Sequence, residues 1–72
     1  MRRVLIVDDE AGVRRSVARG TGWAELGFTV IGEAADGEEG LSAAERDAPD
    51  LIVTDIHMPR MDGLAMMTAL RE

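Results

Sequence analysis

The chain has 72 residues, no cysteine, and 14 acidic against 8 basic side chains, which gives a formal net charge of −6. This length allows one domain at most, and a domain of this size buries only about 60% of its unfolded surface. The composition excludes disulfides and thiolate metal sites, and the negative charge argues against direct nucleic-acid binding by this segment. No apolar run is long enough to cross a bilayer and no signal peptide precedes the first strand, so we expect a cytoplasmic protein without a membrane partner.

The first predicted elements are a buried strand and an amphipathic helix. The unbroken apolar run 4–7 is typical of a strand that is buried on both faces, as in a parallel sheet. Val13 and Val17 lie one helical turn apart and predict a helix over about 10–20, whose arginines form a solvated face. A glycine-punctuated loop follows, and we expect its Trp23 to pack against this helix.

A weaker strand and a capped helix come next. The strand is predicted over about 29–33, where Gly32 interrupts the apolar pattern as is typical of an edge strand. Asp36, followed three residues later by Glu39, is typical of a capping arrangement. The helix that begins here is expected to end near Asp47, because an alanine, a proline and an aspartate follow.

The last two elements complete an alternating pattern. The apolar run 51–54 predicts a third strand, and Asp62 with Gly63 opens a final helix. Apolar residues recur in this helix at every third position: Leu64, Met67 and Leu70. Strand and helix thus alternate three times (βαβαβα), which indicates right-handed parallel crossovers and an α/β fold.

Three aspartates follow two of these strands. Asp8 and Asp9 come directly after the first strand, and Asp55 comes directly after the third. Parallel strands end on the same side of a sheet, so we expect the three carboxylates to converge at one edge. Two carboxylates about 4 Å apart repel by roughly 4 kcal/mol at an effective dielectric near 20. Such a cluster requires a divalent cation, a proton, or a phosphoryl group with its metal.

Several segments together carry a resemblance to one protein family. They are residues 4–10, 50–59 and 61–63, with 32–34 and 36–41 between them. Together they resemble a response-regulator receiver domain of two-component systems. The resemblance implies a three-layer, flavodoxin-like fold with strand order 2-1-3-4-5, reduced here to 2-1-3, so that residues 1–72 form a partial receiver domain. Residues 23–28 are further similar to receivers that are joined to AraC-type DNA-binding output domains.

The resemblance also implies roles for individual residues. Asp55 would accept a phosphoryl group from a sensor histidine kinase. Mg²⁺, for which Mn²⁺ can substitute, would be bound by Asp9, by Asp55, by Asp8 through a water, and by the backbone carbonyl of His57. Mg²⁺ prefers hard oxygen ligands in this kind of arrangement. The implied function is a phosphoryl-accepting signalling module that controls a transcriptional output, and not a turnover enzyme.

The chain departs from the family where it ends, after the third helix. Strands four and five are missing, and with them the lysine and the switch hydroxyl; no lysine occurs anywhere in the sequence, and Thr54 is a strand residue and not that hydroxyl. We therefore expect a truncated receiver that switches poorly. Its third strand becomes an exposed edge, which predicts a homodimer in which these strands meet, together with Met66, Met67 and Leu70 of the last helix.

Other interpretations remain open from the residues alone. Asp9 could simply cap the first helix. A metal-dependent phosphohydrolase could use Asp55 as its nucleophile, although it would want a second carboxylate where His57 stands. A mononucleotide-binding half-domain would need a glycine-rich turn after the first strand, and Asp8 and Asp9 stand there instead. A protein-interaction fragment that is never phosphorylated is a further alternative.

Overall fold

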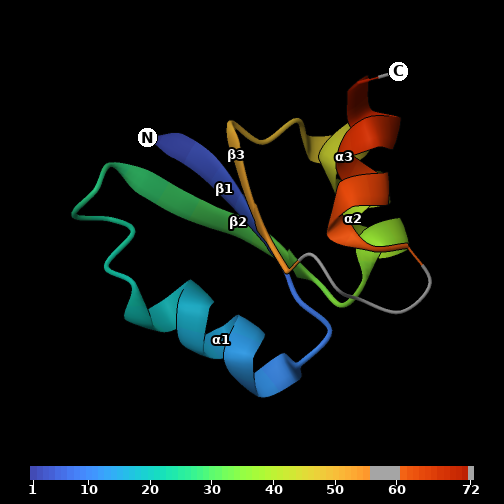
Figure 1. The fold of residues 1–72 in the computed structure, drawn as a ribbon. Coiled ribbons are helices and arrows are strands. Elements are labelled where there is room, and N and C mark those ends of the chain that lie inside the picture. The colour runs from blue at the N-terminus through green and yellow to red at the C-terminus, as the bar shows by residue number, and fades with distance from the viewer. Residues whose placement is uncertain (56–60, 72) are drawn as a thin grey trace.

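A computed structural model describes residues 1–55 and 61–71 of the chain. Three strands alternate with three helices, as the sequence predicts, and their bounds lie within two residues of the expected ones (Figure 1). In chain order they are β1 (Arg2–Val7), α1 (Ala11–Gly20), β2 (Phe28–Ala34), α2 (Gly37–Asp47), β3 (Leu51–Thr54) and α3 (Gly63–Arg71). None of the helices in the described part of the chain is long and apolar enough to cross a membrane.

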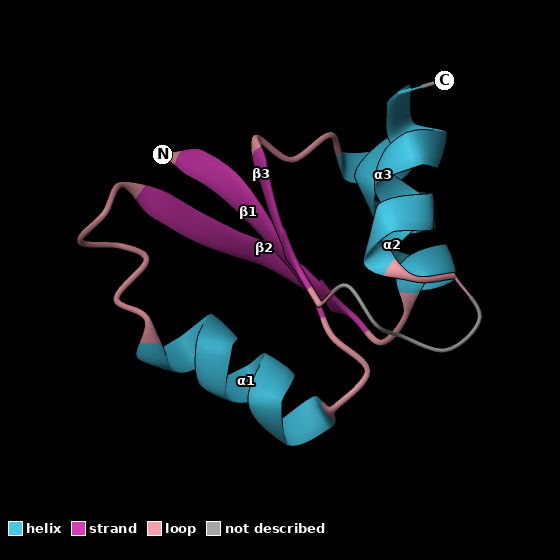
Figure 2. Cartoon of the chain, viewed as in Figure 1, coloured by secondary structure: helices cyan, strands magenta, loops and turns pink. Residues whose placement is uncertain are grey.

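The three strands form one parallel sheet in the order β2-β1-β3, which confirms the predicted order 2-1-3. β1 is the central strand, and Val4 and its three apolar successors are at most 1% exposed because both faces of the strand are covered. α1 lies on one face of the sheet, and α2 and α3 lie together on the other (Figure 2). This is the expected three-layer α/β architecture.

β2 is an irregular edge strand, in agreement with the interruption that Gly32 predicts. Val4 pairs with Val30, whereas the next residue of β1, Leu5, pairs with Gly32, so the register shifts by one residue. The pairing recovers beyond this point, and β2 ends with Ala34 opposite Val7. The carboxyl ends of β1 and β2 are therefore level at the edge where the acidic residues begin.

The α2–α3 face of the sheet holds the main core. Its buried members are Leu5, Val7, Ala34, Ala43, Ala44 and Met66. Two glycines of α2 allow this close packing: a Cβ on Gly40 would lie 2.6 Å from Met66 Sδ, and a Cβ on Gly37 would lie 1.8 Å from the backbone oxygen of Met61. Any larger residue at these positions would push α3 and its leading loop away from α2.

Both helices on this face have side-chain caps at their N-termini. Asp36 Oδ1 accepts a hydrogen bond of 2.9 Å from the Glu39 amide, which confirms the predicted cap of α2. Asp62 Oδ1 accepts one of 2.8 Å from the Ala65 amide at the start of α3. α2 ends at Asp47, and the next residue, Ala48, adopts the left-handed conformation with φ of 45° and donates its amide to the Ala44 carbonyl.

The buried stripe of α3 differs from the three-residue repeat in the sequence. Leu64 and Met67 are 61% and 47% exposed, whereas Met66 is fully buried. A strict three-residue spacing drifts around a helix that has 3.6 residues per turn, so the repeat does not stay on one face. Because Met66 is enclosed between α2 and the sheet, the expectation that it contributes to a dimer interface is wrong.

α1 is attached differently, because none of its residues is buried and Val13 is 44% exposed. The Trp23 indole Nε1–H donates a 2.9 Å hydrogen bond to the Val17 carbonyl, so the expected packing of Trp23 against this helix is confirmed. The expectation that all arginines of α1 form a solvated face is wrong for Arg14. Its side chain is only 14% exposed, because its guanidinium pairs with Glu33 of β2.

Candidate functional site

The three aspartates converge at the carboxyl edge of the sheet. Asp8 and Asp9 follow β1, Asp55 follows β3, and one carboxylate oxygen of each lies within 4.8 Å of the others. Asp8 is half-buried, while Asp9 and Asp55 are exposed. The juxtaposition that parallel strands predict is therefore present, and the cluster opens to solvent on one side.

Backbone hydrogen bonds set the positions of two of these residues. The Asp8 amide donates to the Ala34 carbonyl at 3.0 Å, and the Asp55 amide donates to the Val7 carbonyl at 3.1 Å. Both bonds continue the ladder of the sheet by one step beyond the strands. The separation of Asp8 from Asp55 thus follows from the parallel pairing of β1 with β3.

The loop from β1 to α1 carries further contacts around Asp8. Asp8 Oδ1 accepts a 2.9 Å hydrogen bond from the Glu10 amide, and the Asp8 carbonyl accepts one of 2.8 Å from Arg14 Nη1. The residue that precedes α1 is Glu10, and its side chain makes no capping bond. Asp9 consequently does not cap α1, and the interpretation of Asp9 as a simple helix cap is not supported by the geometry.

The electrostatics of the cluster are those of a surface site. Because Asp9 and Asp55 are exposed, their mutual repulsion at about 4 Å lies between about 1 kcal/mol, the value in bulk water, and about 4 kcal/mol, the value at an effective dielectric near 20. Exposed carboxylates that are held close together without a sulfur ligand suit a hard divalent cation that keeps several of its waters. The donor set therefore fits Mg²⁺ or Mn²⁺. His57, whose carbonyl is an expected ligand, lies outside the described residues.

Thr54 lies beside the cluster but its hydroxyl is engaged locally. Thr54 Oγ1–H donates a 2.9 Å hydrogen bond to the carbonyl of Asp55. Thr54 is the last residue of β3, so the expectation that it is a strand residue is confirmed. Asp36 and Asp62, in turn, act as helix caps, as described above, and take no part in the cluster.

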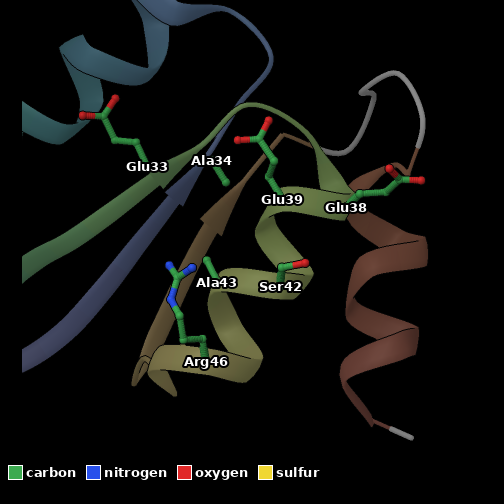
Figure 3. Close-up of a pocket in the computed structure, with 7 residues that line it drawn as sticks. All are labelled: Glu33, Ala34, Glu38, Glu39, Ser42, Ala43 and Arg46. Atoms are coloured by element: carbon green, nitrogen blue, oxygen red, sulfur yellow. The ribbon is translucent and has the colours of Figure 1, made fainter.

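A polar hollow, which is separate from the acidic cluster and which no sequence motif indicated, lies between β2 and α2 (Figure 3). Its volume is about 340 Å³, and it is lined by Glu33, Ala34, Glu38, Glu39, Ser42, Ala43 and Arg46. The spacing of the α2 members is that of one helix face, which is the signal that could have located it. The hollow does not gather carboxylates as the first site does: among the described residues, Asp8, Asp9 and Asp55 form the one such group.

Comparison with known proteins agrees with this architecture. Residues 4–72 match the model of the response regulator receiver domain. The protein-glutamate methylesterase/protein-glutamine glutaminase of Maricaulis maris is 53% identical over an alignment of 72 positions, which covers 94% of this chain and 17% of that protein.

Two solved structures are similar over almost the whole chain. The receiver domain of AraT from Geobacillus stearothermophilus has a TM-score of 0.91 at 43% identity, covering 97% of this chain and 54% of that one. The two-component transcriptional regulator AraC from Clostridium phytofermentans has a TM-score of 0.88 at 36% identity, with the same coverage of 97% and 54%. This chain thus spans about half the length of the solved chains and a smaller part of the curated relative. It belongs to the response regulator receiver domain family.

Proposed function

We propose that this chain accepts a phosphoryl group on Asp55 in a site that binds Mg²⁺, as a signalling module of a two-component system. The observation that carries the proposal is the approach of the Asp8, Asp9 and Asp55 oxygens to within 4.8 Å of one another. Membership of the receiver family supports it. The donor would be a phosphohistidine of a sensor histidine kinase, and the output would be transcriptional, as the name of the AraC neighbour suggests.

Each residue of the cluster has a defined part in this proposal. An Asp55 carboxylate oxygen attacks the phosphorus; a P–O bond forms, the P–N bond to the donor histidine breaks, and an acyl phosphate results. Asp55 is exposed, as a residue that must meet a second protein has to be. Asp9, also exposed, would bind the cation directly, whereas Asp8, which is half-buried, would act through a water. The bound cation supplies neutralisation of the charge that develops during phosphoryl transfer.

Metal binding is the first test of the proposal. Titration of Mn²⁺ into ¹⁵N-labelled protein should broaden the amide signals of residues 8, 9 and 55 before all others. Asp9→Asn should weaken binding, and Glu25→Gln, which removes an exposed carboxylate from the loop before β2, should leave it unchanged. Saturating Mg²⁺ should also raise the free energy of unfolding, by about 2.7 kcal/mol at a hundred times the dissociation constant. Equal broadening of the signals along the whole chain would refute the assignment of a metal site to these residues.

Phosphorylation is the second test. Incubation with acetyl phosphate and Mg²⁺, followed by intact-mass measurement, should show the addition of one phosphoryl group, and Asp55→Asn should abolish it. We expect slow labelling, because the sequence contains no lysine to neutralise the transferred group. Labelling that persists in Asp55→Asn would move the acceptor to another residue and contradict the proposal.

Self-association through the β3 side of the molecule is part of the same proposal. β3 is an edge strand of the described sheet, and beside it lies an apolar hollow of about 360 Å³. The residues that line it are Pro49, Asp50, Leu51, Ile52, Met67, Leu70 and Arg71. A second copy could pair with this edge and cover the exposed side chain of Met67.

Sedimentation velocity at micromolar concentration tests this association. Met67→Lys should shift the dimer towards monomer, because it puts a charge on a side chain that is 47% exposed beside β3. Val13→Lys is the matched control, because Val13 is 44% exposed but belongs to α1 on the opposite face of the sheet. A wild-type chain that sediments as a monomer, or a dimer that Met67→Lys leaves intact, would refute the interface.

A further inference from the structure

Apolar packing does not explain why the charged side chain of Arg14 in α1 is largely shielded from solvent. Its side chain is 14% exposed on a helix that has no buried residue, whereas Arg15 and Arg19 of the same helix are exposed. A guanidinium is withdrawn from water only when its donors find acceptors. The reason for its position must therefore lie in the groups that it contacts.

The Arg14 guanidinium joins three parts of the chain. Its Nε–H donates to Glu33 Oε1 at 3.1 Å, and its Nη1–H donates to the Asp8 carbonyl at 2.8 Å. Figure 3 shows that Glu33 extends from the end of β2 towards α1, away from the other polar side chains of the hollow. The planar guanidinium fixes the angle between its donors, so Glu33 and the Asp8 carbonyl are held in a set relation to each other.

These contacts leave little freedom to the peptide that links Asp8 to Asp9. The amide of Asp8 is bonded to the sheet at Ala34, its side chain accepts the Glu10 amide, and its carbonyl is bonded to Arg14. A peptide group is planar, so fixing the Asp8 carbonyl also fixes the direction in which Asp9 leaves. Asp9 itself is exposed, and its orientation depends on this peptide.

We propose that Arg14 is a positioning residue, which holds the carbonyl of Asp8 so that the carboxylates of Asp8 and Asp9 face the cation, with Glu33 holding the guanidinium in turn. This inference rests on the proposed function of the acidic cluster. Charge alone gives Arg14 the opposite effect, since a cation near the cluster repels a second cation. Removal of Arg14 should therefore weaken cation binding if Arg14 positions the carboxylates, and strengthen it if only its charge matters.

The Mn²⁺ dissociation constant distinguishes the two signs. Arg14→Met keeps much of the side-chain length and should weaken Mn²⁺ binding about 10-fold, the lower end of the range for outer partners of metal ligands. Arg15→Met removes the same charge from an exposed position of α1 and should leave binding unchanged or make it slightly tighter. Unchanged or tighter binding by Arg14→Met would overturn the inference. Measurement below the unfolding transition keeps any loss of stability out of the comparison.

An NMR measurement without metal distinguishes the positioning role of Arg14 from the proposed function of the acidic cluster. In ¹⁵N relaxation without metal, Arg14→Met should lower the order parameters of residues 8–10, and Arg15→Met should not. If the wild-type chain binds no Mn²⁺ while Arg14→Met loosens this loop, the proposed function fails and the positioning role stands. If the wild type binds Mn²⁺ while Arg14→Met changes neither the loop nor the affinity, the positioning role fails and the function stands.

Two further variants test the geometry of the contact. Arg14→Lys should bind Mn²⁺ more tightly than Arg14→Met but less tightly than the wild type, because one ammonium group does not reproduce the two fixed donors of a guanidinium. Wild-type affinity in Arg14→Lys would show that the fixed donor geometry is not needed. Glu33→Met should weaken binding in the wild-type background and have almost no effect in Arg14→Met, because the two residues act as one unit. Additive effects of the two substitutions would show that Glu33 does not act through Arg14.

Discussion

The two faces of the sheet are covered by helices that are attached in different ways. On one face, α2 and α3 pack through apolar contacts that enclose Met66 completely and leave no room for a side chain on Gly40. On the other face, α1 has no buried residue, and directional contacts from Arg14 and Trp23 connect it to its surroundings. The first face supplies most of the apolar burial, and the second places the loop that carries Asp8 and Asp9.

This difference separates stability from site geometry. Apolar packing is strong but sets no particular direction, whereas a hydrogen bond is weak in net free energy and strict in geometry. Substitutions on the α2–α3 face should therefore change the free energy of unfolding most. Substitutions among the α1 contacts should change it less while disturbing the loop at the acidic cluster.

The largest expected effect comes from truncation of the buried core on the α2–α3 face. Met66→Ala should lower the free energy of unfolding by about 3 kcal/mol, because it leaves a cavity beneath a fully buried side chain. Val13→Ala on α1 should change it by less than about 0.5 kcal/mol, since that side chain is 44% exposed. Urea titration followed by far-UV circular dichroism measures both. Similar losses for the two variants would mean that the faces do not differ.

A second pair of variants uses the same chemical change on both faces. Gly37→Ala should destabilise the fold by about 2 kcal/mol, because its Cβ would lie 1.8 Å from the Met61 backbone oxygen. Gly12→Ala in α1 should stabilise it by about 0.5–1 kcal/mol, because the added Cβ meets no atom within 4 Å and alanine favours a helix. Thermal unfolding should show melting temperatures that move in opposite directions. A shift of the same sign in both would contradict the close approach of α2 to Met61.

A smaller loss is expected from one of the directional contacts of α1. Trp23→Phe removes the indole hydrogen bond to the Val17 carbonyl and should destabilise the chain by about 1 kcal/mol. The loss stays moderate because this carbonyl also accepts the Thr21 hydroxyl at 2.8 Å. Circular dichroism is the suitable signal, since the variant contains no tryptophan. A loss equal to that of Met66→Ala would assign Trp23 a core role that its half-buried position does not suggest.

The smallest effect is expected from a charge pair at the end of α2. The hydrogen bond from Arg46 lowers the pKa of the Asp47 carboxyl below its ordinary value. A lowered pKa in the folded state stabilises the fold above the ordinary value, and this contribution disappears as the pH falls through the folded value, below about pH 4.

Because this pair is on the surface, Asp47→Asn and Arg46→Gln should each give a change at pH 7 that barely exceeds the experimental error. The change should shrink further in high salt and vanish in acid, which urea titrations at two pH values would show. A change that persists at low pH would have to come from something other than the ion pair.

Backbone features of the fold follow from the sequence because their signals are local. The alternation of apolar runs with helical patterns predicts every element, and the Asp36 cap is visible three residues before its partner Glu39. The convergence of Asp8 with Asp55 also follows, because the side on which parallel strands end does not depend on side-chain detail. These are properties of hydrogen-bond pattern and spacing.

Features that depend on the meeting of distant segments were harder to predict. The repeat of three in α3 does not tell which side chain is buried, because it drifts around the helix, and only the packing of α3 on α2 shows that Met66 faces inward. The role of Arg14 was missed because its partner Glu33 lies 19 residues away on another element. Within α1, Arg14 and Arg15 look alike, and only the position of β2 distinguishes them.

The backbone hydrogen bonds from Asp8 to Ala34 and from Asp55 to Val7 affect which substitutions the acidic cluster can accept during evolution. Because the sheet ladder holds these peptides, exchange of a clustered aspartate for asparagine removes a charge without moving the chain. Each such exchange also relieves a repulsion of about 1–4 kcal/mol, depending on the effective dielectric at the surface. Stabilising substitutions are therefore available within the acidic cluster, and its three carboxylates persist only where selection keeps what they do.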